Sequence, residues 1–205
     1  MGHLSERRRL EATPILFFGR DGDPSLVDKA APGPGGYPSF SRDGRSIFFS
    51  GGLDEGELRI WKLPVAGGTP TPVSKTRGAI SIEAPNGDVY FVDAVDRPGV
   101  IWRLPAGEGH ATRVLDGVVL GNFDVVEEGL YYIDRVSGDA GSFSDRPDGE
   151  TRLRYFEFAT SRSTTVATNL GTIGLGLSAT RDGRTVFFSR VDSSTDELIL
   201  VDNFR

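Results

Sequence analysis

Two nearly identical segments stand near opposite ends of the sequence, SRDGRSIFF at 41–49 and TRDGRTVFF at 180–188. Two diverged copies, PNGDVYF and EEGLYYI, lie between them. Each copy contains one glycine at the expected turn, at Gly44, Gly87, Gly129 and Gly183. By subtraction, these glycines are 43, 42 and 54 residues apart. Because repeated units bury their faces against their neighbours, the chain is expected to fold as an array of similar units.

Each copy predicts a β-hairpin. An Asp-Gly, Asn-Gly or Glu-Gly pair tolerates the positive φ of a tight turn, and the aromatic and β-branched residues that follow are typical of strands. First strands are expected to end at the turns, in residues 37–42, 79–84, 121–127 and 174–180. Third strands are expected at 58–65, 99–106, 153–160 and 197–204. Short fourth strands are expected at 69–74, 110–115 and 163–168.

A period of about 40 to 45 residues with four strands is typical of the blade of a β-propeller. The sequence therefore predicts an all-β propeller with four four-stranded blades. The predicted blades are residues 37–74, 79–115, 120–168 and 174–205, the last without its outer strand. The gap of 54 exceeds its neighbour by 12 residues (54 − 42), which predicts an insertion at 136–150 in the third blade.

The two ends of the chain raise the question of how the ring closes. Residues 1–11 are expected to form a terminal tail, and residues 12–29 two partial blade strands. An open sheet edge is exposed to pairing with other chains, so propellers join their ends. Two arrangements satisfy this: closure by strand exchange between the termini, or pairing of two copies as a ring of 2 × 4 blades.

The segments PSFSRDGRSIFFSG and ELRIWKLPVAGGTPTPVS resemble the TolB-like, WD-type propeller repeat. The end of the chain, LSATRDGRTVFFSRVDSSTDELILVDNFR, looks like the last blade of propellers at the C-termini of large bacterial regulators and kinases. The resemblance implies a fold that binds partners through its faces, without implying a particular partner. The second and third copies depart from the pattern, with IEAPNGD and VVEEG where Ser-x-Asp-Gly is typical.

Composition excludes several classes of function. A net charge of −6 argues against a nucleic-acid partner, since phosphate binding depends on clustered Lys and Arg. With no cysteine, the chain forms no disulfide and no zinc–thiolate site. No apolar run approaches the roughly 18 residues of a membrane span, and the start lacks the apolar core of a secretory signal. The chain as written would be cytoplasmic, whereas a longer parent protein could be periplasmic.

Three residues are candidate oxygen ligands for a metal ion near the propeller axis. Asn122 and Asp124 are two apart on a predicted inner strand and share a face, and Glu83 occupies the equivalent region of the preceding repeat. Oxygen ligands of this kind suit Ca²⁺, the hard cation held by propeller lactonases and related hydrolases. The alternative is that these polar side chains line a water-filled channel, with no cofactor.

Nucleophilic catalysis with a histidine base is not expected, because the only histidines, His3 and His110, fall in the tail and in a turn before an outer strand. The insertion is a candidate binding loop, because inserted loops in regular repeats often form binding surfaces. Its candidate contact residues are Asp139, Ser142, Phe143, Asp145 and Arg146.

These observations favour a non-enzymatic binding or scaffold module for a protein or small-molecule ligand, with a homodimer as one possible assembly. The alternative function is a metal-dependent, lactonase-like hydrolase with an axial calcium-type site. A third hypothesis is that the chain is a propeller fragment without an independent function, since it carries half a blade at each end.

Overall fold

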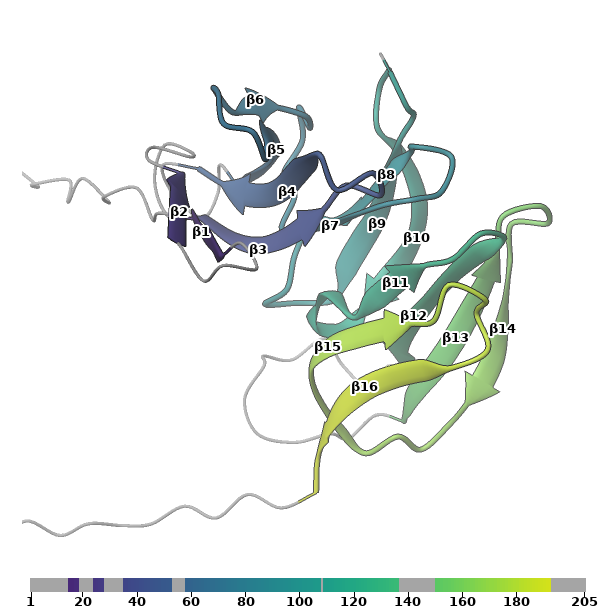
Figure 1. Ribbon diagram of the computed structural model, residues 1–205. Coiled ribbons are helices and arrows are strands. Elements are labelled where there is room, and N and C mark those ends of the chain that lie inside the picture. The colour runs from purple at the N-terminus through teal and green to yellow at the C-terminus, as the bar shows by residue number, and fades with distance from the viewer. Residues whose placement is uncertain are drawn as a thin grey trace, which may run out of the picture.

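The computed structural model describes residues 15–18, 24–27, 35–52, 58–107, 109–136 and 150–192. In these residues every sheet is antiparallel, and the sheets follow one another along an arc (Figure 1). Three sheets have four strands each and two have two strands. The described part of the chain contains no helix with the length and hydropathy of a membrane span. The all-β propeller architecture predicted from the repeats is confirmed.

The three four-stranded sheets are the first three blades. Blade 1 contains β3 (Gly35–Phe40), β4 (Ser46–Gly51), β5 (Arg59–Pro64) and β6 (Thr71–Pro72). Blade 2 contains β7 (Ile80–Glu83), β8 (Val89–Val92), β9 (Gly99–Leu104) and β10 (Thr112–Val118). Blade 3 contains β11 (Phe123–Val125), β12 (Gly129–Arg135), β13 (Thr151–Glu157) and β14 (Arg162–Ala167), and a single 3-10 turn, η2 (Val119–Gly121), leads into it. In each blade the strands pair in chain order, so the first strand is innermost and the fourth is an edge.

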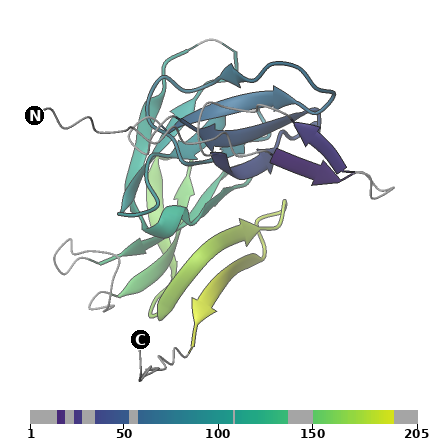
Figure 2. The same cartoon turned by 90° about the vertical axis from the view of Figure 1, so that its left-hand side faces the viewer.

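The two ends of the arc are half-blades in the described residues. Blade 4 contains β15 (Thr172–Ala179) and β16 (Val186–Val191), and the predicted strand at 197–204 lies outside the described residues. At the other end, β1 (Ile15–Phe18) and β2 (Pro24–Val27) form a hairpin of their own, as predicted for 12–29. This hairpin lies beside blade 1, while β15 and β16 lie beside blade 3 (Figures 1 and 2). The two half-blades belong to separate sheets.

The first and last hairpins share one hydrogen-bonded turn, which explains their matching sequences. The Ser41 hydroxyl and the Arg45 amide both donate to Asp43 Oδ1, at 2.7 and 2.9 Å. In blade 4, Thr180 and Arg184 donate to Asp182 Oδ1 in the same way, at 2.6 and 3.1 Å. Gly44 and Gly183 have φ of 69° and 66°, a region that glycine adopts without steric cost.

The hairpin predicted for the third repeat is present, but Gly129 is not the turn residue it was predicted to be. Gly129 begins strand β12 and has no positive φ, because the turn there is one of only two residues, Glu127 and Glu128, with the Val126 amide donating to the Gly129 carbonyl. A Cβ at Gly129 would instead collide with the Phe156 carbonyl oxygen. Glycine is required here by close strand approach.

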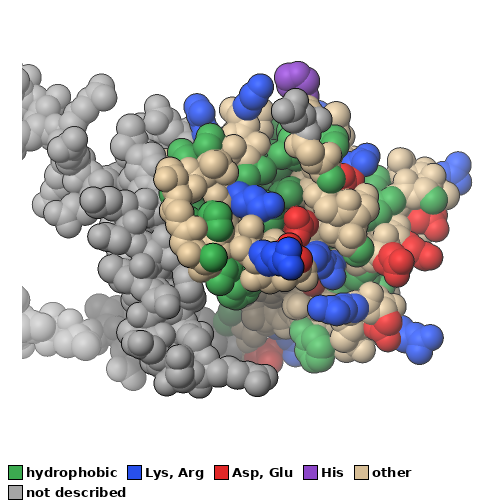
Figure 3. Space-filling model, turned by 45° about the horizontal axis from the view of Figure 1, so that its top comes forward, with side chains coloured by type: hydrophobic (Ala, Val, Ile, Leu, Met, Phe, Trp, Pro, Cys, Tyr) green, Lys and Arg blue, Asp and Glu red, His purple; other side chains and the backbone are tan. Residues whose placement is uncertain are grey.

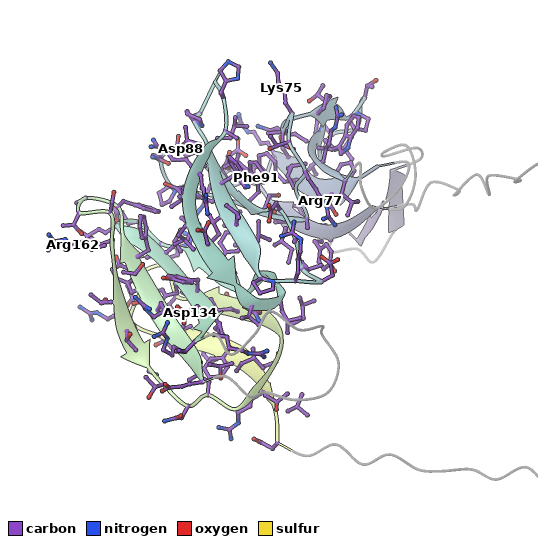
Figure 4. The ribbon with its side chains drawn as sticks, turned by 180° about the vertical axis from the view of Figure 1, so that it is seen from behind. Lys75, Arg77, Asp88, Phe91, Asp134 and Arg162 are labelled. Atoms are coloured by element: carbon purple, nitrogen blue, oxygen red, sulfur yellow. The ribbon has the colours of Figure 1, made fainter. Side chains whose placement is uncertain are left out.

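The core consists of side chains packed between successive blades. One aromatic side chain on the second strand of each of blades 1 to 3 faces the following blade: Phe48, Tyr90 or Tyr131. Each stands two residues after the residue whose carbonyl accepts the hydrogen bond across the hairpin turn. In blades 2, 3 and 4 the residue at the next position along the second strand, which is Phe91, Tyr132 or Phe188, faces the preceding blade. Phe91, for example, is fully buried in one cluster with Phe48 and Ile60 of blade 1 (Figure 4). These repeated aromatic side chains therefore pack one blade against the next.

Candidate binding site on the turn face

The inner strands β3, β7, β11 and β15 contact one another in that order and form the axial edge of the arc. Arg42 crosses this edge from the first hairpin turn. Its amide donates to Glu83 Oε2 at 2.6 Å, and its guanidinium donates to the Glu83 carbonyl and to the Val125 carbonyl, both at 3.0 Å. One arginine thus joins blades 1, 2 and 3, and the Glu83 carboxylate is already engaged in that network.

The two other candidate metal ligands, Asn122 and Asp124, join blade 3 to blade 4. Asn122 is 1% exposed, and its amide donates to the Gly174 carbonyl at 2.9 Å and accepts from the Gly176 amide at 2.7 Å. Asp124 Oδ2 accepts from the Ala179 amide at 2.7 Å and from the Ser178 hydroxyl at 3.3 Å. Both side chains act as hydrogen-bonded connections between neighbouring blades.

The calcium hypothesis therefore has no preassembled ligand set among these residues. Glu83 bonds to blade 1, whereas Asn122 and Asp124 bond to blade 4. Across the described residues, no three His, Asp or Glu side chains gather in a way that could hold a metal ion. The metal site stays a prediction that binding measurements must test.

A pocket of about 280 Å³ opens between blades 2 and 3 on the face that carries the hairpin turns. It is lined by Ala84, Pro85, Asn86, Glu127 and Phe158. The first three belong to the β7–β8 turn, Glu127 to the β11–β12 turn, and Phe158 directly follows β13. The pocket thus combines an aromatic ring, a carboxylate and a carboxamide, a lining that can recognise a small ligand or a partner's side chain.

The pocket walls are held in place by packing. The ring of Phe158 stacks on Tyr90, with the ring centroids 5.1 Å apart and the planes inclined by 15°. The Phe158 amide donates to the Glu128 carbonyl at 3.0 Å, which ties β13 to the β11–β12 turn. Burial raises the pKa of Tyr90 above its ordinary value. The aromatic wall is therefore rigid and uncharged at neutral pH.

A buried carboxylate supports the other wall. Asp88 is 4% exposed and accepts hydrogen bonds from Arg103 Nε at 2.6 Å, the Ala106 amide at 2.8 Å and Asn86 Nδ2 at 3.0 Å (Figure 4). Burial opposes ionisation of Asp88, but the hydrogen bonds outweigh it and hold the pKa of the carboxyl below its usual value. The ionised Asp88 in turn fixes Asn86 at the pocket.

The surface of the described residues carries charges of both signs. Figure 3 shows Lys and Arg side chains interspersed with Asp and Glu over the face in view. His110 is exposed beside the outer strand β10, as predicted. The predicted binding-loop residues at 139, 142, 143, 145 and 146 and His3 lie outside the described residues.

Comparison with solved structures shows which fold this is. The chain superimposes on TolB from Acinetobacter baumannii with a TM-score of 0.63 over 88% of its residues, at 15% sequence identity. The fold is that of a TolB-like β-propeller. A putative TolB from Agrobacterium tumefaciens gives a TM-score of 0.53 over 71% of the chain at 20% identity. The structure of a nidogen/laminin complex gives 0.54 over 83% at 16% identity.

The chain spans 44% of the length of Acinetobacter TolB and 52% of the Agrobacterium protein. No protein family model matches the sequence, and no characterised protein matches it in sequence. The likeness therefore concerns the fold alone.

Sequence reasoning did not identify the pocket residues Pro85, Asn86, Glu127 and Phe158. The positions of Pro85, Asn86 and Glu127 in the turns of adjacent repeats were a usable signal. Such turns lie on one face of a propeller, so these residues could have been expected to lie near one another. Phe158 had no such signal, since only the register of β13 against β12 brings its ring over Tyr90.

Proposed function

We propose that the chain is a non-enzymatic binding unit, whose turn-face pocket receives a group with a hydrogen-bond donor beside an apolar surface. The observation that carries this proposal is the pocket between blades 2 and 3, where the exposed Glu127 stands beside the ring of Phe158. A carboxylate accepts hydrogen bonds from cations and amides, and an aromatic face attracts cations and apolar groups. The end of an arginine or lysine side chain has this combination.

Preorganisation supports the same proposal. Because Phe158 is stacked on Tyr90 and Asn86 is bonded to Asp88, a ligand would not have to order these walls when it binds. The axial polar groups, by contrast, are used to hold the blades together. The turn face rather than the axis is thus the better candidate for contact with a ligand.

The test is a titration observed by protein NMR. The probes are N-acetyl-arginine amide and N-acetyl-lysine amide, with N-acetyl-glutamate amide as the charge control. The two basic probes are expected to shift the amide resonances of residues 86, 87, 127 and 158, and the acidic probe is not.

A matched pair of variants locates the binding. Glu127→Gln is expected to abolish the shifts caused by the basic probes. Glu128→Gln removes the same charge from the neighbouring exposed residue, which does not line the pocket, and is expected to leave them unchanged. Equal shifts in both variants, or shifts centred on another surface, would contradict the proposal.

Calcium gives an independent outcome. If Ca²⁺ raises the melting temperature of the chain, and Asp124→Asn removes that rise, an axial metal site exists and metal-assisted chemistry becomes the better hypothesis. An unchanged melting temperature across divalent cations favours the binding unit.

A further inference from the structure

The pocket between blades 2 and 3 offers hydrogen-bond acceptors, while most of its donors are already engaged. Pro85 has no main-chain N–H group, and the amides of Ala84 and Phe158 already donate to main-chain carbonyls at 2.8 and 3.0 Å. Asn86 Nδ2 already donates to a carboxylate at 3.0 Å, whereas the exposed carboxylate of Glu127 can only accept when it is ionised. The pocket is therefore suited to a ligand that brings several hydrogen-bond donors.

Two arginines are bonded to the segments that form the pocket, and both bind groups other than Glu127. Arg42 donates to two main-chain carbonyls, both at 3.0 Å, and Arg103 donates to the Asp88 carboxylate at 2.6 Å. Among the residues that the structure describes, no ion pair includes Glu127. The negative charge of Glu127 is therefore left for a cationic ligand.

The aromatic wall of the pocket is a ring held from two sides. Phe158 is stacked on Tyr90 and lies edge-on to Phe156, with the Phe156 and Phe158 ring centroids 6.2 Å apart and their planes inclined by 67°. Tyr90 and Phe156 are buried, so they fix the plane of the Phe158 ring. The part of the ring that lines the pocket is therefore a fixed aromatic surface, against which a planar cation can pack.

The pocket has room for one side chain. Its volume of about 280 Å³ is just below the roughly 300 to 1,000 Å³ of a cavity that holds a drug-sized ligand. Because the pocket opens on the face that carries the hairpin turns, the side chain can come from a peptide or protein segment that runs over this face.

We propose that the pocket binds the guanidinium of an arginine residue in preference to the ammonium of a lysine residue. This inference rests on the proposed function and chooses between its two basic ligands. A guanidinium is flat, carries five N–H groups and can donate two parallel hydrogen bonds to one carboxylate, here that of Glu127. It also packs flat on an aromatic ring, here that of Phe158. An ammonium is a point charge that is more strongly hydrated, so it loses more hydration beside an apolar wall.

The test measures the dissociation constants of three capped amino acids by NMR titration. The probes are N-acetyl-arginine amide, N-acetyl-lysine amide and N-acetyl-citrulline amide, whose side chain has nearly the shape of arginine without its charge. The arginine probe is expected to bind on the order of tenfold more tightly than the lysine probe. The citrulline probe is expected to bind at least about tenfold more weakly than the arginine probe, because it forms no ion pair with Glu127.

Two conservative variants locate the preference. Phe158→Leu keeps an apolar wall without the flat ring, and Glu127→Asp keeps the charge on a side chain one methylene shorter. Each is expected to weaken binding of the arginine probe more than that of the lysine probe, so that the preference falls below about threefold. Phe187→Leu and Glu128→Asp make the same changes at exposed residues that do not line the pocket, and are expected to keep the preference. Because Glu127 is exposed, Glu127→Asp is expected to fold even if Phe158→Leu does not.

The outcomes separate this inference from the proposed function. Equal affinities of the arginine and lysine probes at the pocket would overturn the inference and leave the proposed function standing, whereas absence of binding by both probes would overturn both. A citrulline probe that binds as tightly as the arginine probe would overturn the inference, because the ion pair with Glu127 would then contribute nothing. An arginine preference that persists in both Phe158→Leu and Glu127→Asp would place its origin elsewhere and overturn it as well.

Discussion

Truncation of the two equivalent phenylalanines, Phe48→Ala and Phe187→Ala, tests the blade-by-blade account of the core most directly. The substitutions remove the same atoms from the same position of nearly the same sequence, 41–49 and 180–188. The only difference is the neighbouring blade. Phe48 is 1% exposed and Phe187 is 65% exposed, so the free energies of unfolding should fall by very different amounts.

The expected magnitudes follow from burial. Replacing a core phenylalanine by alanine costs about 3 to 5 kcal/mol, which combines lost transfer energy with the cavity left behind. Phe48 also has the ammonium of Lys62 at 5.2 Å from its ring centroid, worth about 0.5 to 1 kcal/mol at a partly exposed site. Phe187 is covered over only about a third of its surface, and a fully buried phenylalanine gains about 1.5 to 3 kcal/mol, so its loss should cost about 1 kcal/mol or less.

The assays are urea unfolding and thermal unfolding, both monitored by tryptophan fluorescence at a protein concentration low enough for the single chain to dominate. We expect Phe48→Ala to lower the free energy of unfolding by about 4 kcal/mol and the melting temperature by about 10 °C. Phe187→Ala should lower each of these quantities by about a quarter as much. Both variants should keep the urea dependence of the parent, which shows that the same surface unfolds. Equal losses in the two variants would refute the assignment of Phe48 to a blade interface and of Phe187 to an open face.

Three further predictions concern single side chains. Asn122→Leu should lower the free energy of unfolding by about 2 to 4 kcal/mol, because it leaves the Gly174 carbonyl and the Gly176 amide without their partner. Thermal unfolding measures this loss. Gly129→Ala should lower the melting temperature strongly, because the new Cβ collides with the backbone of β13. Gly107→Ala has open space around the new Cβ, so it should lower the melting temperature only through the strain of its positive φ. Because the folded pKa of Asp88 lies below the ordinary 3.8, its contribution to stability is present above about pH 5 and is lost as the pH falls through the folded pKa. Melting temperatures measured from about pH 6 to pH 3 should therefore fall less steeply in Asp88→Asn than in the parent.

The fold could be predicted because its determinants are local and repeated. The turn residues Asp43 and Asp182 hold their hairpins through bonds to residues two positions away, so the turns are visible in the sequence itself. The period then fixes the number of blades. The boundaries were less predictable: β10 extends to Val118, beyond the predicted 110–115, because it pairs along nearly all of β9 through two irregularities in register.

The roles of the axial polar residues could not be predicted in the same way. The sequence places Asn122 and Asp124 on an inner strand, and both a metal site and a water-filled channel agree with that placement. Only the structure shows that their partners are the backbone of β15, more than 50 residues away in sequence. These hydrogen bonds between blades leave no periodic signal, because one partner in each is a main-chain N–H or C=O group, which nearly every residue type carries.

Equivalent side chains of the first and last blades differ in exposure although their sequences nearly match. Between 41–49 and 180–188 the residues that face the following blade have kept their character, although one set is buried and the other exposed. Turn geometry requires the Ser/Thr-x-Asp-Gly residues, but it requires nothing of Phe187, whose ring makes no contribution to the turn. An exposed phenylalanine at a position that is buried in blade 1 offers an apolar surface for association. Within the described residues, the face of blade 4 that carries Phe187 therefore has the composition of a blade interior.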